Sequence, residues 1–102
     1  MKPPAKIRVG PYIFTVTLAD ILDPASGQLH SYGITRNAEE TITLHKGQSA
    51  GNMRDTLLHE LLHAACHASG APADENAIRP LSGTLISILR DNPRLVEFLT
   101  EP

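Results

Sequence analysis

Residues 56–65 read Thr-Leu-Leu-His-Glu-Leu-Leu-His-Ala-Ala, and the fold and chemistry we expect depend on this stretch. It holds the pattern His-Glu-x-x-His within an otherwise apolar run that predicts one helix. Residues four apart lie on the same face of a helix, so His59 and His63 project from one side, about one turn apart. Two imidazoles at this spacing can bind one Zn²⁺, and Glu60 beside them can act as a general base on water.

This helix is expected to have two chemically different sides. At about 100° per residue, leucine and alanine cover a wide side that should be buried, and the polar residues form a stripe on the other side. The wide side holds Leu57, Leu58, Leu61, Leu62, Ala64 and Ala65, and the stripe holds Thr56, His59, Glu60, His63, Cys66 and His67. An ordinary solvent-facing stripe needs no glutamate next to the first histidine, so the pattern favours a metal site.

A catalytic zinc usually has three protein ligands, so one more must come from elsewhere. Glu75 is our candidate, because the chain should reverse at Gly70–Pro72 and bring the next helix back against the histidines. Asp74 is adjacent, although it suits the N-cap of that helix. His67 is a further alternative, but it lies ~6 Å beyond the second histidine along the helix axis. Cys66 is ~4.5 Å beyond it on a short side chain, which favours a small buried residue.

The first part of the chain has the alternation of β-structure. Residues 6–18 predict one opening strand, in which Gly10-Pro11 marks a bulge, a bend or an edge position. Residues 20–28 contain turn-forming residues and predict a loop. Residues 29–35 and 41–45 predict a hairpin whose second strand turns Ile42 and Leu44 towards the core.

Three helices should follow. The first is expected from Met53 to Ala68, with Asn52 as its N-cap and a stop at Gly70. Together with the strands, this predicts an α+β fold. A small antiparallel sheet of about three strands should pack on the His-Glu-x-x-His helix, followed by a second, kinked helix and a short C-terminal helix.

The second and third helices are punctuated by proline. The second should begin near Asp74, where apolar residues start to recur at spacings of three and four, and Pro80 should kink it. Asn92 then resembles an N-cap, with Pro93 as the first residue of the last helix.

Composition narrows the class of protein. The chain has 102 residues, one cysteine and a net charge of −2. We expect a single domain over residues 1–102, with scattered basic residues that predict no nucleic-acid partner. No apolar run approaches the ~20 residues of a membrane span, and the start, Met-Lys-Pro-Pro-Ala-Lys, lacks the apolar core of a signal peptide. With one cysteine and no internal disulfide, the expected location is the cytoplasm.

Thr-x-x-His-Glu-Leu-Leu-His-Ala-Ala followed by Glu75 resembles the zincin metallopeptidases, and among them the gluzincins. The small size and the hairpin before the helix are similar to compact phage and bacterial proteins of the ImmA/IrrE-like kind. The resemblance covers residues ~30–90 and rests on residues 56–75. It implies that His59, His63 and Glu75 are zinc ligands, that Glu60 is the general base, and that a peptide or protein substrate lies extended along residues 41–45 as an edge strand.

Three functions are therefore compared. The first is a zinc-dependent peptidase, for which Tyr32, His45 and His67 are candidates to stabilise the oxyanion. The second is a non-catalytic binding module in which zinc holds two helices together. The third is a metal-free helical protein that recruits partners through an exposed edge strand.

Overall fold

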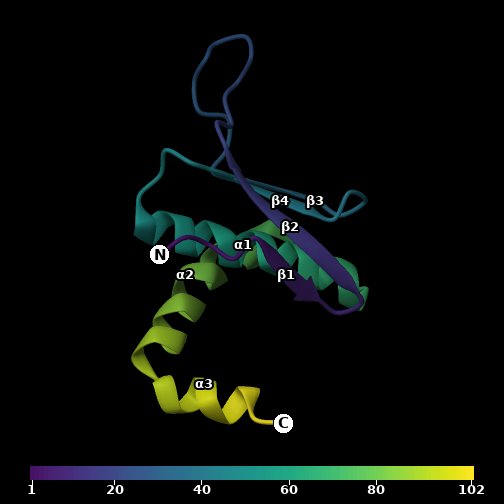
Figure 1. Cartoon of the computed structure of the whole chain (residues 1–102), viewed down its shortest axis with the longest axis vertical. Coiled ribbons are helices and arrows are strands. Elements are labelled where there is room, and N and C mark those ends of the chain that lie inside the picture. Colours follow the sequence, from purple (N-terminus) through teal and green to yellow (C-terminus); the bar gives the residue numbers. More distant parts are fainter.

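One four-stranded sheet packs against a long helix, and two further helices extend beyond it in the computed structural model of residues 1–102 (Figure 1). The elements are β1 (Lys6–Val9), β2 (Tyr12–Ala19), β3 (Gly33–Arg36), β4 (Thr41–His45), α1 (Ala50–Ser69), α2 (Glu75–Asp91) and α3 (Pro93–Thr100). The expected α+β class, with a small sheet and a C-terminal helix, is confirmed.

The opening segment forms two strands, so the prediction of one strand over residues 6–18 was wrong. β1 and β2 are antiparallel, and Val9 pairs with Tyr12 across a turn made of Gly10 and Pro11. Gly10 has a φ of 57°, a left-handed conformation that glycine adopts readily and that two-residue hairpin turns require. The Gly-Pro pair therefore reverses the chain, where we had expected only a bulge or bend.

The strand order is β1-β2-β4-β3, and β2 runs parallel to β4. This corrects two expectations, because the sheet is mixed and residues 41–45 form an inner strand. After β2, the loop over residues 20–32 leads to β3, which lies two positions from β2 in the sheet. β4 then occupies the position between β2 and β3. The predicted β3–β4 hairpin is confirmed, but the edge strand is β3, over residues 33–36.

The core lies between the sheet and α1. It is formed by Phe14, Val16, Ile42, Leu44 and Ala64, and the inward orientation expected for Ile42 and Leu44 is confirmed. The most buried residues of α1 are four apart, which is the spacing of one helix face. They are Thr56, Glu60 and Ala64, whereas Ala65 is exposed and the leucines of α1 are only partly buried. Two residues assigned to the polar stripe therefore face the sheet.

The observed helix ends agree in part with those predicted from the sequence. Ser49 caps α1 by accepting a hydrogen bond from the Asn52 amide, so the helix begins earlier than expected and Asn52 is not its N-cap. Gly70 ends α1 with a φ of 77°, as expected. Asp74 caps α2, and the helix continues through Pro80. Pro93 opens α3, but Asn92 makes no capping hydrogen bond through its side chain.

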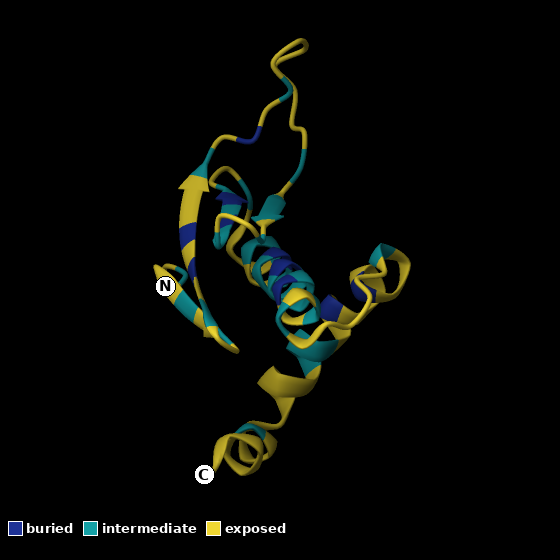
Figure 2. Ribbon diagram, turned by 90° about the vertical axis from the view of Figure 1, so that its right-hand side faces the viewer, coloured by how far each residue is buried: buried dark blue, intermediate teal, exposed yellow.

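Helices α2 and α3 lead away from the sheet. Figure 1 shows α3 at the far end of α2 from β1–β4, and Figure 2 shows that almost all of its surface is exposed. None of the helices combines the length and hydrophobicity needed to cross a lipid bilayer.

Candidate metal centre

Two histidines of α1 and the first residue of α2 meet in one cluster. Glu75 Oε2 lies 2.6 Å from Nε2 of His63, and Glu75 Oε1 lies 2.8 Å from Nε2 of His59. The four-residue spacing on α1 aligns the two rings, whose centroids are 5.0 Å apart. The turn at Gly70 and the Asp74 cap then start α2 beside them. One donor atom from each of the three residues lies within 4.8 Å of the others, so the group could hold a metal ion.

Opposing influences act on the pKa of Glu75. Burial raises it, whereas the hydrogen bond with His63 and the positive charges of His59, His63 and Arg79 lower it, and the net result is a pKa below the ordinary glutamate value. Arg79 Nη2 lies 3.6 Å from Glu75 Oε1, one turn along α2. The carboxylate is thus held ionised, which is the form that binds a cation.

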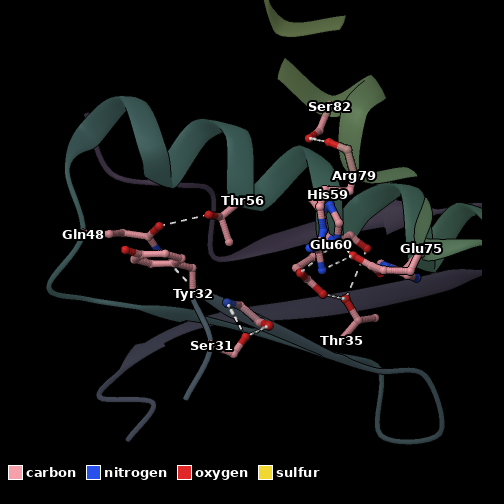
Figure 3. Close-up of polar contacts among 12 residues, drawn as sticks. Ser31, Tyr32, Thr35, Gln48, Thr56, His59, Glu60, Glu75, Arg79 and Ser82 are labelled. Carbon is pink, nitrogen blue, oxygen red and sulfur yellow. Dashed lines mark hydrogen bonds and ion pairs between the residues drawn. The ribbon is translucent and has the colours of Figure 1, made fainter. Parts of the chain in front are cut away.

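Glu60 lies beside this cluster but is fixed by the sheet. Its side chain is buried, and its Oε2 is 4.0 Å from Nε2 of His59. The Thr35 hydroxyl lies 2.7 Å from Glu60 Oε1 and 3.2 Å from the Glu60 carbonyl oxygen (Figure 3). A hydroxyl has one hydrogen to donate, and the shorter contact is to the charged oxygen. This contact leaves the other carboxylate oxygen, Oε2, on the side of the histidines.

Gly33 allows β3 to approach α1 at this point. A Cβ atom at residue 33 would lie 2.6 Å from Thr56 Cγ2 and 3.0 Å from Glu60 Cγ. Such contacts are too short for any side chain, so the close approach of strand and helix requires glycine here. Ser31 also holds the strand entry, because its hydroxyl donates to the Gly33 carbonyl and accepts from the Gly33 amide.

The cluster opens into a polar cavity of about 550 Å³. Its lining comes from the end of the 20–32 loop, from β3, α1 and α2, and Tyr32 is its one hydrophobic residue. Gln48 fixes the loop end, because its amide donates to the carbonyls of Tyr32 and His45 while its oxygen accepts from Thr56. The cavity has the size of a small-ligand site and the polarity of one that binds charged or hydrogen-bonding groups.

The other sequence candidates lie outside the cluster. The ring of His67 is exposed and lies against Tyr12, with centroids 5.1 Å apart. His45 accepts a hydrogen bond from the Ile21 amide and does not line the cavity, and Cys66 is half-buried away from it. Asp74 is used as the α2 cap. Of the three oxyanion candidates, only Tyr32 lines the cavity.

Some residues of the site were not predicted from the sequence. Thr35 reaches Glu60 only because of its position in β3, and no local sequence pattern indicates this contact. Arg79 could have been found, because it lies four residues after Glu75 on the same helix face. Asp55 also lines the cavity, and its buried Oδ1 has no hydrogen-bond partner. His30 and Ser82 also line the cavity, from the loop and from α2.

The residues present suit a divalent cation. Two imidazole nitrogens and one ionised carboxylate form a common set of ligands for catalytic zinc. Asp55, one turn before His59 on α1, lines the same cavity and offers a buried oxygen with no hydrogen-bond partner. The donor set therefore fits a metal of the zinc type better than Mg²⁺ or Ca²⁺, which prefer oxygen ligands throughout.

Comparison with known proteins does not place the chain. No protein-family model, curated protein or solved structure matches it.

Proposed function

We propose that this protein is a zinc-dependent peptidase of the zincin type. The observation that supports the proposal most strongly is the convergence of His59, His63 and Glu75 beside a buried glutamate, Glu60. A structural metal site needs ligands alone, whereas hydrolysis also needs a base next to the metal. Glu60 is such a group, and it is held by the sheet.

The chemistry divides between the metal and the protein. A zinc ion held by His59, His63 and Glu75 would polarise a scissile carbonyl and acidify a water molecule. Glu60 takes a proton from the attacking water through Oε2 and delivers it to the leaving amine, which leaves Glu60 ionised again. The Thr35 hydroxyl on Oε1 keeps the carboxylate in the orientation that this transfer requires.

The substrate would be a peptide in an extended conformation along β3. This strand borders the cavity and has a free edge, because its one partner is β4. A peptide added to that edge would run past Glu60 and the histidines, with main-chain hydrogen bonds giving affinity. Tyr32 and Arg79 line the cavity and are our candidates to stabilise a developing oxyanion.

Two substitutions separate metal binding from catalysis. Zinc content and cleavage of a peptide library, read by mass spectrometry, are measured on His59→Ala and Glu60→Gln. His59→Ala should lose both zinc and hydrolysis, whereas Glu60→Gln should keep zinc and lose hydrolysis. Glu97→Gln, the same change on exposed α3, is the matched control and should alter neither. Undiminished cleavage by Glu60→Gln would disprove the assigned role.

One observation favours a second function, a non-catalytic module in which zinc joins two helices. On α2, only Ile78 and Ser82 are buried, so the apolar contact that holds it to α1 is small. A metal bridging α1 and Glu75 would add to that contact. Stoichiometric zinc, large destabilisation by chelators and no cleavage of any peptide by the wild type would support this function over the first.

A further inference from the structure

An apolar surface without a partner runs along α2 and α3. Six large side chains form it, and we call them the arm face: Leu81, Ile88, Leu89, Leu95, Phe98 and Leu99. Phe98 is 73% exposed and Leu99 is 62% exposed, the highest values among the large apolar residues after the N-terminal methionine. Six large apolar side chains left exposed on two neighbouring helices are more than the scattered single ones of an ordinary surface, and they mark an interaction site.

Helix α3 has little to stabilise it within one copy of the chain. It has eight residues, none of them buried, and Asn92 provides no side-chain cap. Val96 is its only residue that is not exposed, and α2 is the element against which it packs. Isolated helices below about 12 residues are marginal in water, so α3 needs a further contact.

The chain exposes more surface than a compact monomer of its mass. A compact monomer of 11.0 kDa exposes about 5,600 Å², whereas this chain exposes 7061 Å². Its radius of gyration is 14.2 Å, against about 13 Å for a compact domain of about 100 residues. The excess of about 1,400 Å² includes the protruding loop over residues 20–32. Each partner in a standard stable interface buries roughly 800 Å², so an interface on α2 and α3 would account for part of this excess.

We propose that the arm face binds a second copy of this chain, with the two α3 helices antiparallel about a two-fold axis. Such an axis places Phe98 near its own copy and Leu95 near the partner's Leu99. The charges fit the same arrangement, because Arg94 lies at the start of α3 and Glu101 directly after its end. Antiparallel pairing brings each Arg94 to the partner's Glu101, and opposed helix dipoles also favour it.

Helix α3, which carries the centre of the arm face, is distant from the metal centre. Glu75 is at the first turn of α2, and the helix has 17 residues, so α3 begins about 25 Å along its axis from Glu75. Self-association is therefore expected to be independent of zinc binding and hydrolysis. Variants on α3 should bind zinc as the wild type does.

The experiment is sedimentation equilibrium of the full chain over a wide concentration range. The wild type should approach twice the monomer mass of 11.0 kDa. Phe98→Asp should weaken dimerisation about 100-fold or more, because it places two charges at the centre of an apolar contact. Leu29→Asp makes the same kind of change on a residue that is 41% exposed in the 20–32 loop, and it should leave the dimer intact. Circular dichroism checks that each variant keeps its helices.

The charge pairing is tested separately. Arg94→Glu and Glu101→Arg should each weaken the dimer about tenfold, and the double variant, with both pairs restored in reverse, should recover it. A wild type that stays monomeric would overturn the proposal, as would a Phe98→Asp protein that remains dimeric. A double variant no tighter than either single one would overturn the antiparallel arrangement.

Discussion

Helix α1 lies on the sheet along one face, whereas α2 contributes only Ile78 and Ser82 to the interior. Both helices nevertheless supply the proposed metal ligands. The body formed by the sheet and α1 holds His59, His63 and the proposed base, Glu60, in fixed positions. The proposed third ligand, Glu75, belongs to α2, which has a small apolar contact with the rest of the protein. A metal bound by these three residues would complete the junction between α1 and α2.

Zinc addition should therefore produce the largest effect on stability. Binding to the folded state adds about 4 kcal/mol when free zinc is a thousandfold above its dissociation constant. Thermal unfolding after chelator treatment, with and without added zinc, measures the change, and His63→Ala should show none of it. Hydrogen exchange should slow most in the first turns of α2. An equal slowing in α3 would contradict a local effect at the junction.

A second test concerns the packing of the sheet against α1. Gly33→Ala should destabilise the protein by about 1–3 kcal/mol, because the added methyl group meets Thr56 and Glu60 where β3 crosses α1. Urea unfolding measures the change.

The matched control is Gly51→Ala in the first turn of α1, where a Cβ atom has no neighbour within 4 Å. It should stabilise the protein by up to about 1 kcal/mol through helix propensity. If Gly33→Ala also stabilised the protein, the close packing at Gly33 would not limit the size of the side chain at that position.

The local sequence pattern predicted α1 and the start of α2 well. The His-Glu-x-x-His spacing, the Gly70 stop and the Asp74 cap depend on residues close in sequence, and together they were enough to bring Glu75 to the histidines. Sequence alone therefore identified the three residues that the structure brings into one cluster.

The sheet was predicted less well because its order depends on distant residues. Polar residues alternate with Ile42 and Leu44, a pattern that an edge strand and an inner strand share. The parallel pairing of β2 with β4 follows from the path of the 20–32 loop, which local pattern does not reveal. The error matters for the site, because the free edge and the Thr35 contact both belong to β3.

Thr35 allows a test of how the sheet positions the proposed base, Glu60. Thr35→Val keeps the shape but removes the hydroxyl donated to Glu60 Oε1, and peptide cleavage should fall about tenfold, or about 1.4 kcal/mol in the barrier. Zinc content should not change, because Thr35 contacts no proposed ligand directly. Thr17→Val removes the hydroxyl of an exposed pair with Thr43 and serves as the control. Loss of zinc in Thr35→Val would show that β3 supports the ligands as well as the base.

The smallest expected effect is the pH dependence of the metal-free junction. The pKa of Glu75 is lowered in the folded state, chiefly by the hydrogen bond with His63 against the opposing effect of burial. A carboxyl group whose pKa is lowered by folding stabilises the folded state at pH values above its ordinary pKa. This stabilisation disappears as the pH falls through the lowered pKa. The side chain is 44% exposed, so solvent limits the contribution to about 1 kcal/mol or less. Carbon-13 NMR titration of the Glu75 carboxyl in chelator-treated protein should give a midpoint below the ordinary glutamate value, and His63→Ala should raise it. A midpoint that His63→Ala leaves unchanged would mean that Glu75 does not hold α2 to the histidines when metal is removed.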